Sequence, residues 1–174
     1  MALFFSLLTS AFFVGIDQVT KYLAVVYLKG QESVPIWPDV FELSYRPNTG
    51  VAFSMMEGYR WLFIPVTALV MGLLIVVLAR SRMSRHLFFR SSCVLIIAGG
   101  IGNLIDRIHL GYVIDFLYFK LIDFPIFNFA DCCVVVGAVL LVIYMLFILK
   151  EEEGETFGSL LFGARKCRKG NNDG

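Results

Sequence analysis

Six carboxylate and amide side chains interrupt the apolar stretches of this 174-residue sequence. They are Asp17, Asn103, Asp106, Asp115, Asn128 and Asp131. Ionisable groups at such places cost free energy unless they pair, line a wet cavity or do chemical work, and a functional cluster is therefore the first hypothesis.

Asp115 is the hardest of these residues to explain by pairing, because it breaks the apolar stretch 112–117. If this segment folds back toward Asp131, two carboxylates meet, and two close carboxylates cannot both ionise easily. One proton held between two aspartates is the working state of an aspartic hydrolase. The ionised member activates water and the protonated member polarises the scissile carbonyl.

The elements that must position these residues are membrane helices. Apolar residues make up 58% of the chain and charged residues 17%, with a mean hydropathy of +0.76, against roughly 45 to 50% and about 25% in soluble domains. A chain with so little polar surface is expected to be a single integral-membrane domain. The net charge of +1 gives no support for nucleic-acid binding.

Four apolar runs are long enough to cross a bilayer. We therefore predict an all-α membrane protein, a four-transmembrane-helix bundle with spans at about 2–28, 61–79, 87–105 and 129–149. Residues 1–150 form this domain and 151–174 form a charged tail. Basic residues cluster between the second and third spans and in the tail, which predicts that both termini are cytoplasmic. The other two loops then face outward.

The polar residues fall at one depth in this topology. At 1.5 Å per residue, Asp17 lies roughly 22 Å from the inner end of its span, and Asn103 and Asp106 lie about 24 to 29 Å along theirs. Asn128 and Asp131 open the fourth span from outside. All five are predicted to share a layer near the outer boundary of the membrane.

The first outer loop carries a strand signal. Phe41, Leu43 and Tyr45 alternate with polar residues before the turn-like sequence Pro47–Gly50. With apolar residues at 51 and 53 after the turn, this predicts a small extracytoplasmic β-hairpin that forms a cradle at the membrane surface. A second outer loop follows the third span and contains Asp115.

Structural explanations compete with the functional one at several positions. Asp17 and Lys21, at i and i+4, can simply neutralise each other. Asn128 and Asp131 are placed as N-cap and N3 of a capping box, and Gly99, Gly100 and Gly102 can serve close helix packing.

No G-x-S-x-G, H-E-x-x-H or phosphate-binding loop occurs, and the four cysteines form no C-x-x-C, so they are interpreted as small apolar residues. The residues alone leave open an aspartic hydrolase or a small proton-coupled transporter, or transporter subunit, that uses its carboxylates as a relay.

Five motifs in order resemble signal peptidase II, the bacterial lipoprotein signal peptidase. They are DQVTK at 17–21, NTGVAF at 48–53, GGIGNLIDR at 99–107, GYVIDF at 111–116 and FNFAD at 127–131. Each motif is weak alone, but their order on a four-span chain is specific. The tail after Lys150 departs from the compact family core and touches no motif.

The resemblance implies an aspartic endopeptidase of the bacterial plasma (inner) membrane, with its active site at the outer leaflet. It would cut diacylglyceryl-modified prolipoproteins just before the lipidated cysteine. Asp115 and Asp131 are the implied catalytic pair. The positions implied to bind substrate or support the site are Asp17, Lys21, Asn48, Gly50, Ala52, Asn103, Asp106, Arg107 and Asn128.

The resemblance also implies no metal or organic cofactor, and inhibition by the cyclic peptide globomycin. Membrane lipids are further expected partners, no nucleic acid is expected to bind, and a monomer is the expected state.

Overall fold

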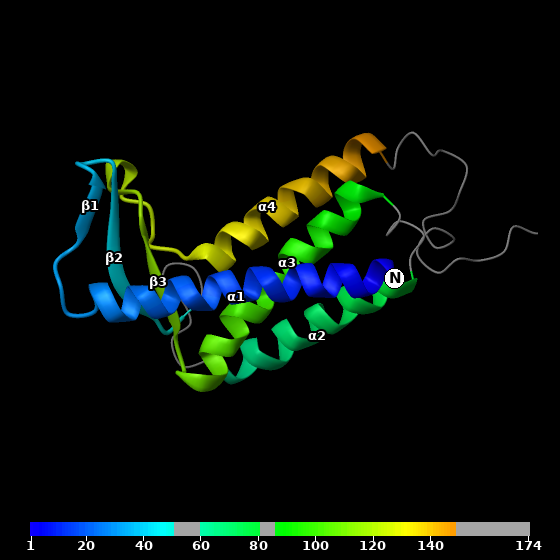
Figure 1. The fold of residues 1–174 in the computed structure, drawn as a ribbon, viewed down its shortest axis with the longest axis horizontal. Coiled ribbons are helices and arrows are strands. Elements are labelled where there is room, and N and C mark those ends of the chain that lie inside the picture. The colour runs from blue at the N-terminus through cyan, green and yellow to red at the C-terminus, as the bar shows by residue number, and fades with distance from the viewer. Residues whose placement is uncertain (51–59, 81–85, 149–174) are drawn as a thin grey trace, which may run out of the picture.

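The computed structural model describes residues 1–50, 60–80 and 86–148, and shows helices running side by side with a small sheet at one end (Figure 1). The helices are α1 (Ala2–Leu28), α2 (Arg60–Arg80), α3 (Leu87–His109) and α4 (Phe129–Ile143), the last continued by a π-helical turn, Tyr144–Ile148. A mostly helical fold is confirmed.

Three helical segments are long and apolar enough to cross a membrane, namely Leu3–Leu28, Leu87–His109 and Phe129–Phe147. In α2, the apolar part Ile64–Arg80 is shorter. The chain is therefore a membrane protein, and the predicted count of four spans stays a prediction. The tail 151–174 and the segment 51–59 lie outside the described residues.

Helix α3 lies between the other three helices and contacts each of them. Its glycines permit this, as predicted. A Cβ added at Gly102 would lie 2.5 Å from Asp17 Oδ2, and one at Gly99 would collide with the backbone carbonyl of Ala130. Cys93 and Cys133 are buried and free of disulfides, which fits their interpretation as small apolar residues.

The sheet has three antiparallel strands in the order β1 (Val34–Trp37), β2 (Phe41–Asn48) and β3 (Val113–Tyr118). The predicted strand at 41–45 is confirmed as part of β2, and it pairs with β1 through a turn at residues 38–40, where Asp39 has a φ of 59°. The predicted return strand at 51 and 53 lies outside the described residues. The segment between α3 and α4 also contributes a strand, because β3 pairs with β2.

Pro47 does not end β2, although proline is confined to strand edges. Strand β1 pairs only with residues 41–43 of β2, so Pro47 has no partner strand on its β1 side among the described residues. On the other side it pairs with Ile114 in β3. The strand can therefore continue to Asn48, one residue into the predicted turn.

The sheet packs against the C-terminal end of α1. Ala24 and Leu28 form a buried cluster with Ile114 and Phe116 of β3. Side chains alternate along a strand, yet residues 113–116 are all buried. Ile114 and Phe116 pack against α1 at this end of the bundle (Figure 1), whereas Asp115 is covered by its hydrogen-bond partners Asn48 and Asn128. Asp115 is thereby held above the helix ends.

Candidate active site

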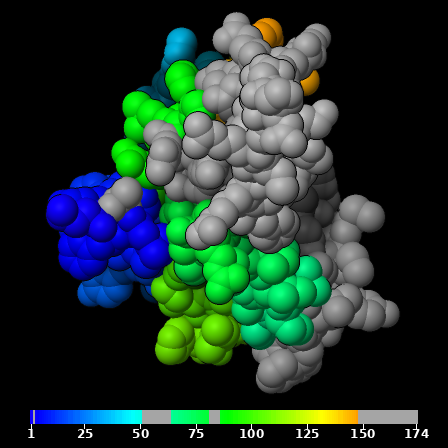
Figure 2. All heavy atoms as spheres, turned by 90° about the vertical axis from the view of Figure 1, so that its right-hand side faces the viewer, coloured from blue at the N-terminus to red at the C-terminus, as the bar shows by residue number. Residues whose placement is uncertain are grey.

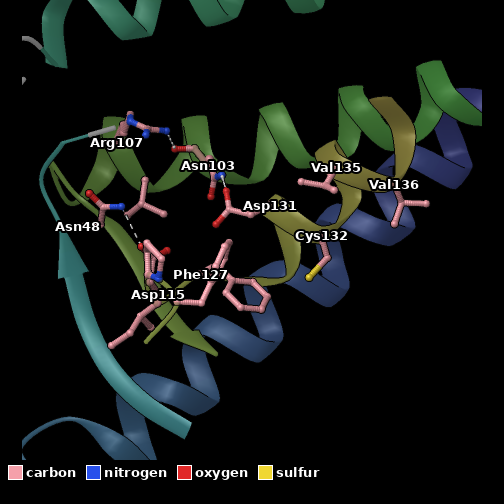
Figure 3. Close-up of a pocket in the computed structure, with 13 residues that line it drawn as sticks. Asn48, Asn103, Arg107, Asp115, Phe127, Asp131, Cys132, Val135 and Val136 are labelled. Carbon is pink, nitrogen blue, oxygen red and sulfur yellow. Dashed lines mark hydrogen bonds between the residues drawn. The ribbon is translucent and has the colours of Figure 1, made fainter. Parts of the chain in front are cut away.

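A cleft of about 590 Å³ opens where β2, β3, α3 and α4 meet, and both predicted catalytic aspartates line it (Figure 3). Asp115 comes from β3 and Asp131 from the first turn of α4. Asn48, Asn103 and Arg107 also line it. Residues from five separate sequence motifs thus reach one cavity or its immediate support.

Asp115 is only 2% exposed. Asn48 Nδ2 donates to its Oδ2 at 2.9 Å, and Asn128 Nδ2 donates to its Oδ1 at 2.7 Å. Burial raises the pKa of Asp115 to about 6. The nearby charge of Asp131 also raises this pKa, whereas the hydrogen bonds from Asn48 and Asn128 lower it. This carboxyl is therefore easier to protonate than an ordinary aspartate.

Asp131 is half-buried and belongs to the capping box of α4. Its backbone N–H donates to Asn128 Oδ1 at 3.0 Å, and the Asn128 backbone N–H donates to Asp131 Oδ2 at 3.1 Å. The predicted cap is confirmed. Asn103 Nδ2 donates to the other oxygen, Oδ1, at 2.8 Å, so the cap leaves Asp131 on the cleft wall.

Lys21 is a buried cationic centre below the aspartates, 1% exposed. Its Nζ lies 2.9 Å from both Asp17 Oδ2 and Asp106 Oδ2, and it donates to Asn103 Oδ1 at 2.9 Å. The ammonium fixes the orientation of the Asn103 amide, because an oxygen facing Lys21 leaves the NH2 group facing Asp131. The expected Asp17–Lys21 pair exists as part of this network.

The two carboxylates beside Lys21 also join separate elements. Asp17 Oδ1 accepts the backbone N–H of Ala130 at 2.9 Å, which connects α1 to the start of α4. Asp106 Oδ2 accepts the backbone N–H of Ile114 at 3.2 Å, which connects α3 to β3. The positions of Asp131 and Asp115 in space therefore depend on this charged network.

Gly50 and Arg107 support the opposite wall. The Gly50 backbone N–H donates to Asn48 Oδ1 at 3.0 Å, which turns the Asn48 NH2 group toward Asp115. Arg107 donates to the backbone carbonyls of Asn103 at 3.3 Å and Gly50 at 3.5 Å. Ala52, also predicted here, lies outside the described residues.

Sequence reasoning missed two parts of the site. Gln18 Nε2 donates to both Asp17 Oδ2 and Asp106 Oδ1 at 3.1 Å, and its place in the first motif was the available signal. The apolar loop 124–127 forms a cleft wall. It folds back because the Phe127 carbonyl accepts backbone N–H groups of β3.

The described residues contain no group of three His, Cys, Asp or Glu side chains that could hold a metal ion. The expectation of no cofactor stays a prediction.

Fold and site together define a membrane protein with a helical bundle and a cleft at one end of it. Two carboxylates line this cleft, and the small sheet forms one of its walls. Residues 9–147 match the family model described as Signal peptidase (SPase) II, and the chain belongs to this family of peptidases.

Two named relatives are similar over most of the chain. A lipoprotein signal peptidase of Halothermothrix orenii is 44% identical over 130 residues, which cover 75% of this chain and 87% of the relative. One of Streptococcus thermophilus is 40% identical over 141 residues, covering 81% and 90%.

Solved structures of bacterial membrane enzymes share the fold. One, obtained by the in meso method at 2.3 Å resolution, has a TM-score of 0.79 and 30% identity, and the match covers 87% of this chain and 93% of that one. Another, at 1.9 Å, has a TM-score of 0.74 and 32% identity, covering 82% and 93%.

Proposed function

We propose that this protein is an aspartic endopeptidase that removes signal peptides from diacylglyceryl-modified bacterial prolipoproteins, cutting before the lipidated cysteine. The observation that carries the aspartic mechanism is the pair Asp115 and Asp131, which line one cleft in unequal surroundings. Family membership and the names of the relatives support the substrate class.

We base the proposed roles on the unequal burial of the two aspartates. Asp115 is 2% exposed and its pKa is raised to about 6, so it takes up a proton more readily than an ordinary aspartate, and in its protonated form it donates a hydrogen bond to the scissile carbonyl oxygen. Asp131, on the more open wall, accepts a proton from the attacking water. When the tetrahedral intermediate collapses, Asp131 returns this proton to the leaving amine. The Asn48, Asn103 and Asn128 amides hold both carboxylates in place.

The walls of the cleft suit a lipidated peptide. Val135 and Val136 on α4 are exposed and apolar beside the aspartates, so acyl chains can lie along α4 in the bilayer while the peptide bond reaches the carboxylates. Phe124 and Phe127 cover the outer side. Globomycin-type cyclic peptides are proposed to fill the same cleft.

The proposed location rests on the family and on the distribution of basic residues along the chain. The protein spans the bacterial inner membrane four times, with α2 as the additional span, and acts as a monomer. Both termini and the tail 151–174 are cytoplasmic, and the aspartates lie at the outer leaflet. A proton-coupled transporter has less support, because the chain belongs to a peptidase family.

Cleavage of a diacylglyceryl-modified prolipoprotein by the purified chain in detergent, without any ion gradient, tests this proposal. Asp115→Asn and Asp131→Asn should each lower the initial rate by at least about a thousandfold, and the double variant should be hardly worse, because the two act as a unit. Asp17→Asn should retain measurable turnover.

Asp39→Asn is the matched control, since this side chain is 89% exposed and remote from the cleft lining, and it should cleave at the wild-type rate. Wild-type turnover in Asp115→Asn or Asp131→Asn would refute the assigned roles. No cleavage by folded wild-type protein would refute the peptidase.

A further inference from the structure

A second groove lies between the first turns of α1 and α3, far from the aspartates. Its volume is about 380 Å³, and its walls combine hydroxyl, cationic and apolar side chains. Arg90 and Asp106 are both on α3, and sixteen residues of helix separate them by about 24 Å. The groove therefore opens at the opposite membrane boundary from the cleft. Figure 2 looks at this end, where blue α1 borders green α3.

Two hydrogen bonds set the alignment of the groove walls. Ser10 Oγ donates to the Val94 carbonyl at 3.1 Å, and Gln18 Nε2 donates to the Gly102 carbonyl at 3.3 Å. Both join residues 84 positions apart, so α1 and α3 run parallel with a fixed offset. The same offset places Ser6 opposite Arg90, and both line the groove.

The polar groups of the groove have unused hydrogen-bonding capacity. Arg90 is half-buried, and its guanidinium makes no ion pair or hydrogen bond with any residue that the structure describes. Ser6 is 4% exposed, and within the described ranges its hydroxyl has no hydrogen-bond partner either. A guanidinium offers five N–H donors in a planar fork that suits phosphate oxygens.

Apart from the hydroxyl groups of Thr9 and Ser91, the rest of the groove wall is apolar. Phe5 is 60% exposed and Leu87 64% exposed at its rim, and Phe13 and Leu95 continue the walls deeper into the membrane. An occupant must therefore carry a negatively charged phosphate at one end and hydrocarbon at the other. A free phosphate ion would leave this apolar wall unused.

We propose that this groove binds an anionic phospholipid of the cytoplasmic leaflet, with its phosphate on Arg90 and Ser6 and an acyl chain along Phe13. The position in the cytoplasmic leaflet rests on the proposed topology of the peptidase. Charge complementarity supports the anionic class, because Arg82 and Arg85 closely precede Leu87 and Arg90 in the sequence and basic residues at cytoplasmic helix ends attract anionic lipids.

Native mass spectrometry of the delipidated full chain in detergent tests the proposal, with phosphatidylglycerol and phosphatidylcholine titrated separately. Wild-type protein should bind its first phosphatidylglycerol more tightly than its first phosphatidylcholine. Arg90→Gln should weaken the first phosphatidylglycerol about fivefold, the factor expected for one cation near a membrane surface. Ser6→Phe, which fills the groove, should weaken both lipids.

Arg80→Gln is the matched control, since Arg80 is an exposed cation at the end of α2 and outside the groove; it should bind like wild type. Equal affinities in Arg90→Gln and Arg80→Gln would overturn the proposal, as would no preference for phosphatidylglycerol. Displacement of the lipid by millimolar inorganic phosphate would reassign the groove to a free anion and overturn it too.

The peptidase assay on the same preparations separates the two proposals. Arg90→Gln in detergent should cleave prolipoprotein at the wild-type rate, because Arg90 lies outside the catalytic cleft. Lipid binding without cleavage by wild-type protein would remove the proposed function and leave the lipid site standing. Cleavage without selective lipid binding would overturn the lipid site and leave the proposed peptidase function standing.

Discussion

Replacing the buried carboxyl of Asp115 by asparagine should change how the stability of the protein depends on pH. Burial raises the pKa of Asp115 from 3.8 to about 6 in the folded protein. The folded state therefore binds this proton more tightly than the unfolded chain does. The resulting stability is fully present below about pH 3.8 and is lost as the pH rises through about 6.

The magnitude follows from the gap between the two pKa values. One pKa unit is worth about 1.36 kcal/mol, so the gap between 3.8 and about 6 corresponds to about 3 kcal/mol. Asparagine also has one acceptor oxygen where Asn48 and Asn128 both donate, which costs about 1 to 2 kcal/mol. That second cost is the same at every pH.

The free energy of unfolding in detergent, measured by chemical denaturation between about pH 3.5 and 8, gives the readout. The free energy of unfolding of the wild type minus that of Asp115→Asn should fall by about 3 kcal/mol as the pH rises across this range. Asp39→Asn is the control, because Asp39 is exposed and asparagine tolerates its left-handed φ of 59°. Its difference from wild type should stay within about 0.5 kcal/mol.

A pH-independent difference for Asp115→Asn would refute the reasoning. It would mean that the carboxyl is hydrated in the folded protein, and burial would then give no reason to make Asp115 the protonated member of the pair.

Three further outcomes are expected. Lys21→Met should destabilise the protein by about 3 to 5 kcal/mol in the same denaturation assay, since it leaves buried carboxylates without their cation; a loss below 1 kcal/mol would contradict the network. Gly102→Ala should slow cleavage at least tenfold by displacing the carboxylate beside it, whereas Gly15→Ala, with no atom within 4 Å, should match wild type; equal rates would contradict this. A membrane-impermeant thiol reagent should label Thr49→Cys on intact cells and Arg82→Cys only after permeabilisation, and the reverse pattern would invert the topology.

The local parts of the site could be predicted from the sequence because short-range rules govern them. A capping box depends on residues three apart, so Asn128 and Asp131 were identified correctly. Helical rise placed the polar residues of three helices in one layer, and the cleft with its Lys21 network brings them together.

The longer-range parts depend on how separate elements pack. The i and i+4 spacing predicts that Lys21 lies beside Asp17. That Lys21 Nζ is equally close to Asp106 depends on the offset between α1 and α3, which the spacing does not give. Pro47 was assigned to the turn because proline is typical of turns, whereas its acceptability within β2 depends on where β1 stops. No pattern within a single strand contains that information.

Asn128 resolves the choice between a structural and a chemical explanation of the polar layer, because it serves both purposes at once. Its Oδ1 accepts the backbone N–H of Asp131 as an ordinary N-cap does, and its Nδ2 donates to Asp115 Oδ1 at 2.7 Å and to Asn103 Oδ1 at 3.1 Å. The amide cannot rotate without breaking the cap. The start of α4 therefore fixes the donor that holds Asp115. Serine or aspartate would cap the helix about as well, but neither offers the NH2 group that this site uses.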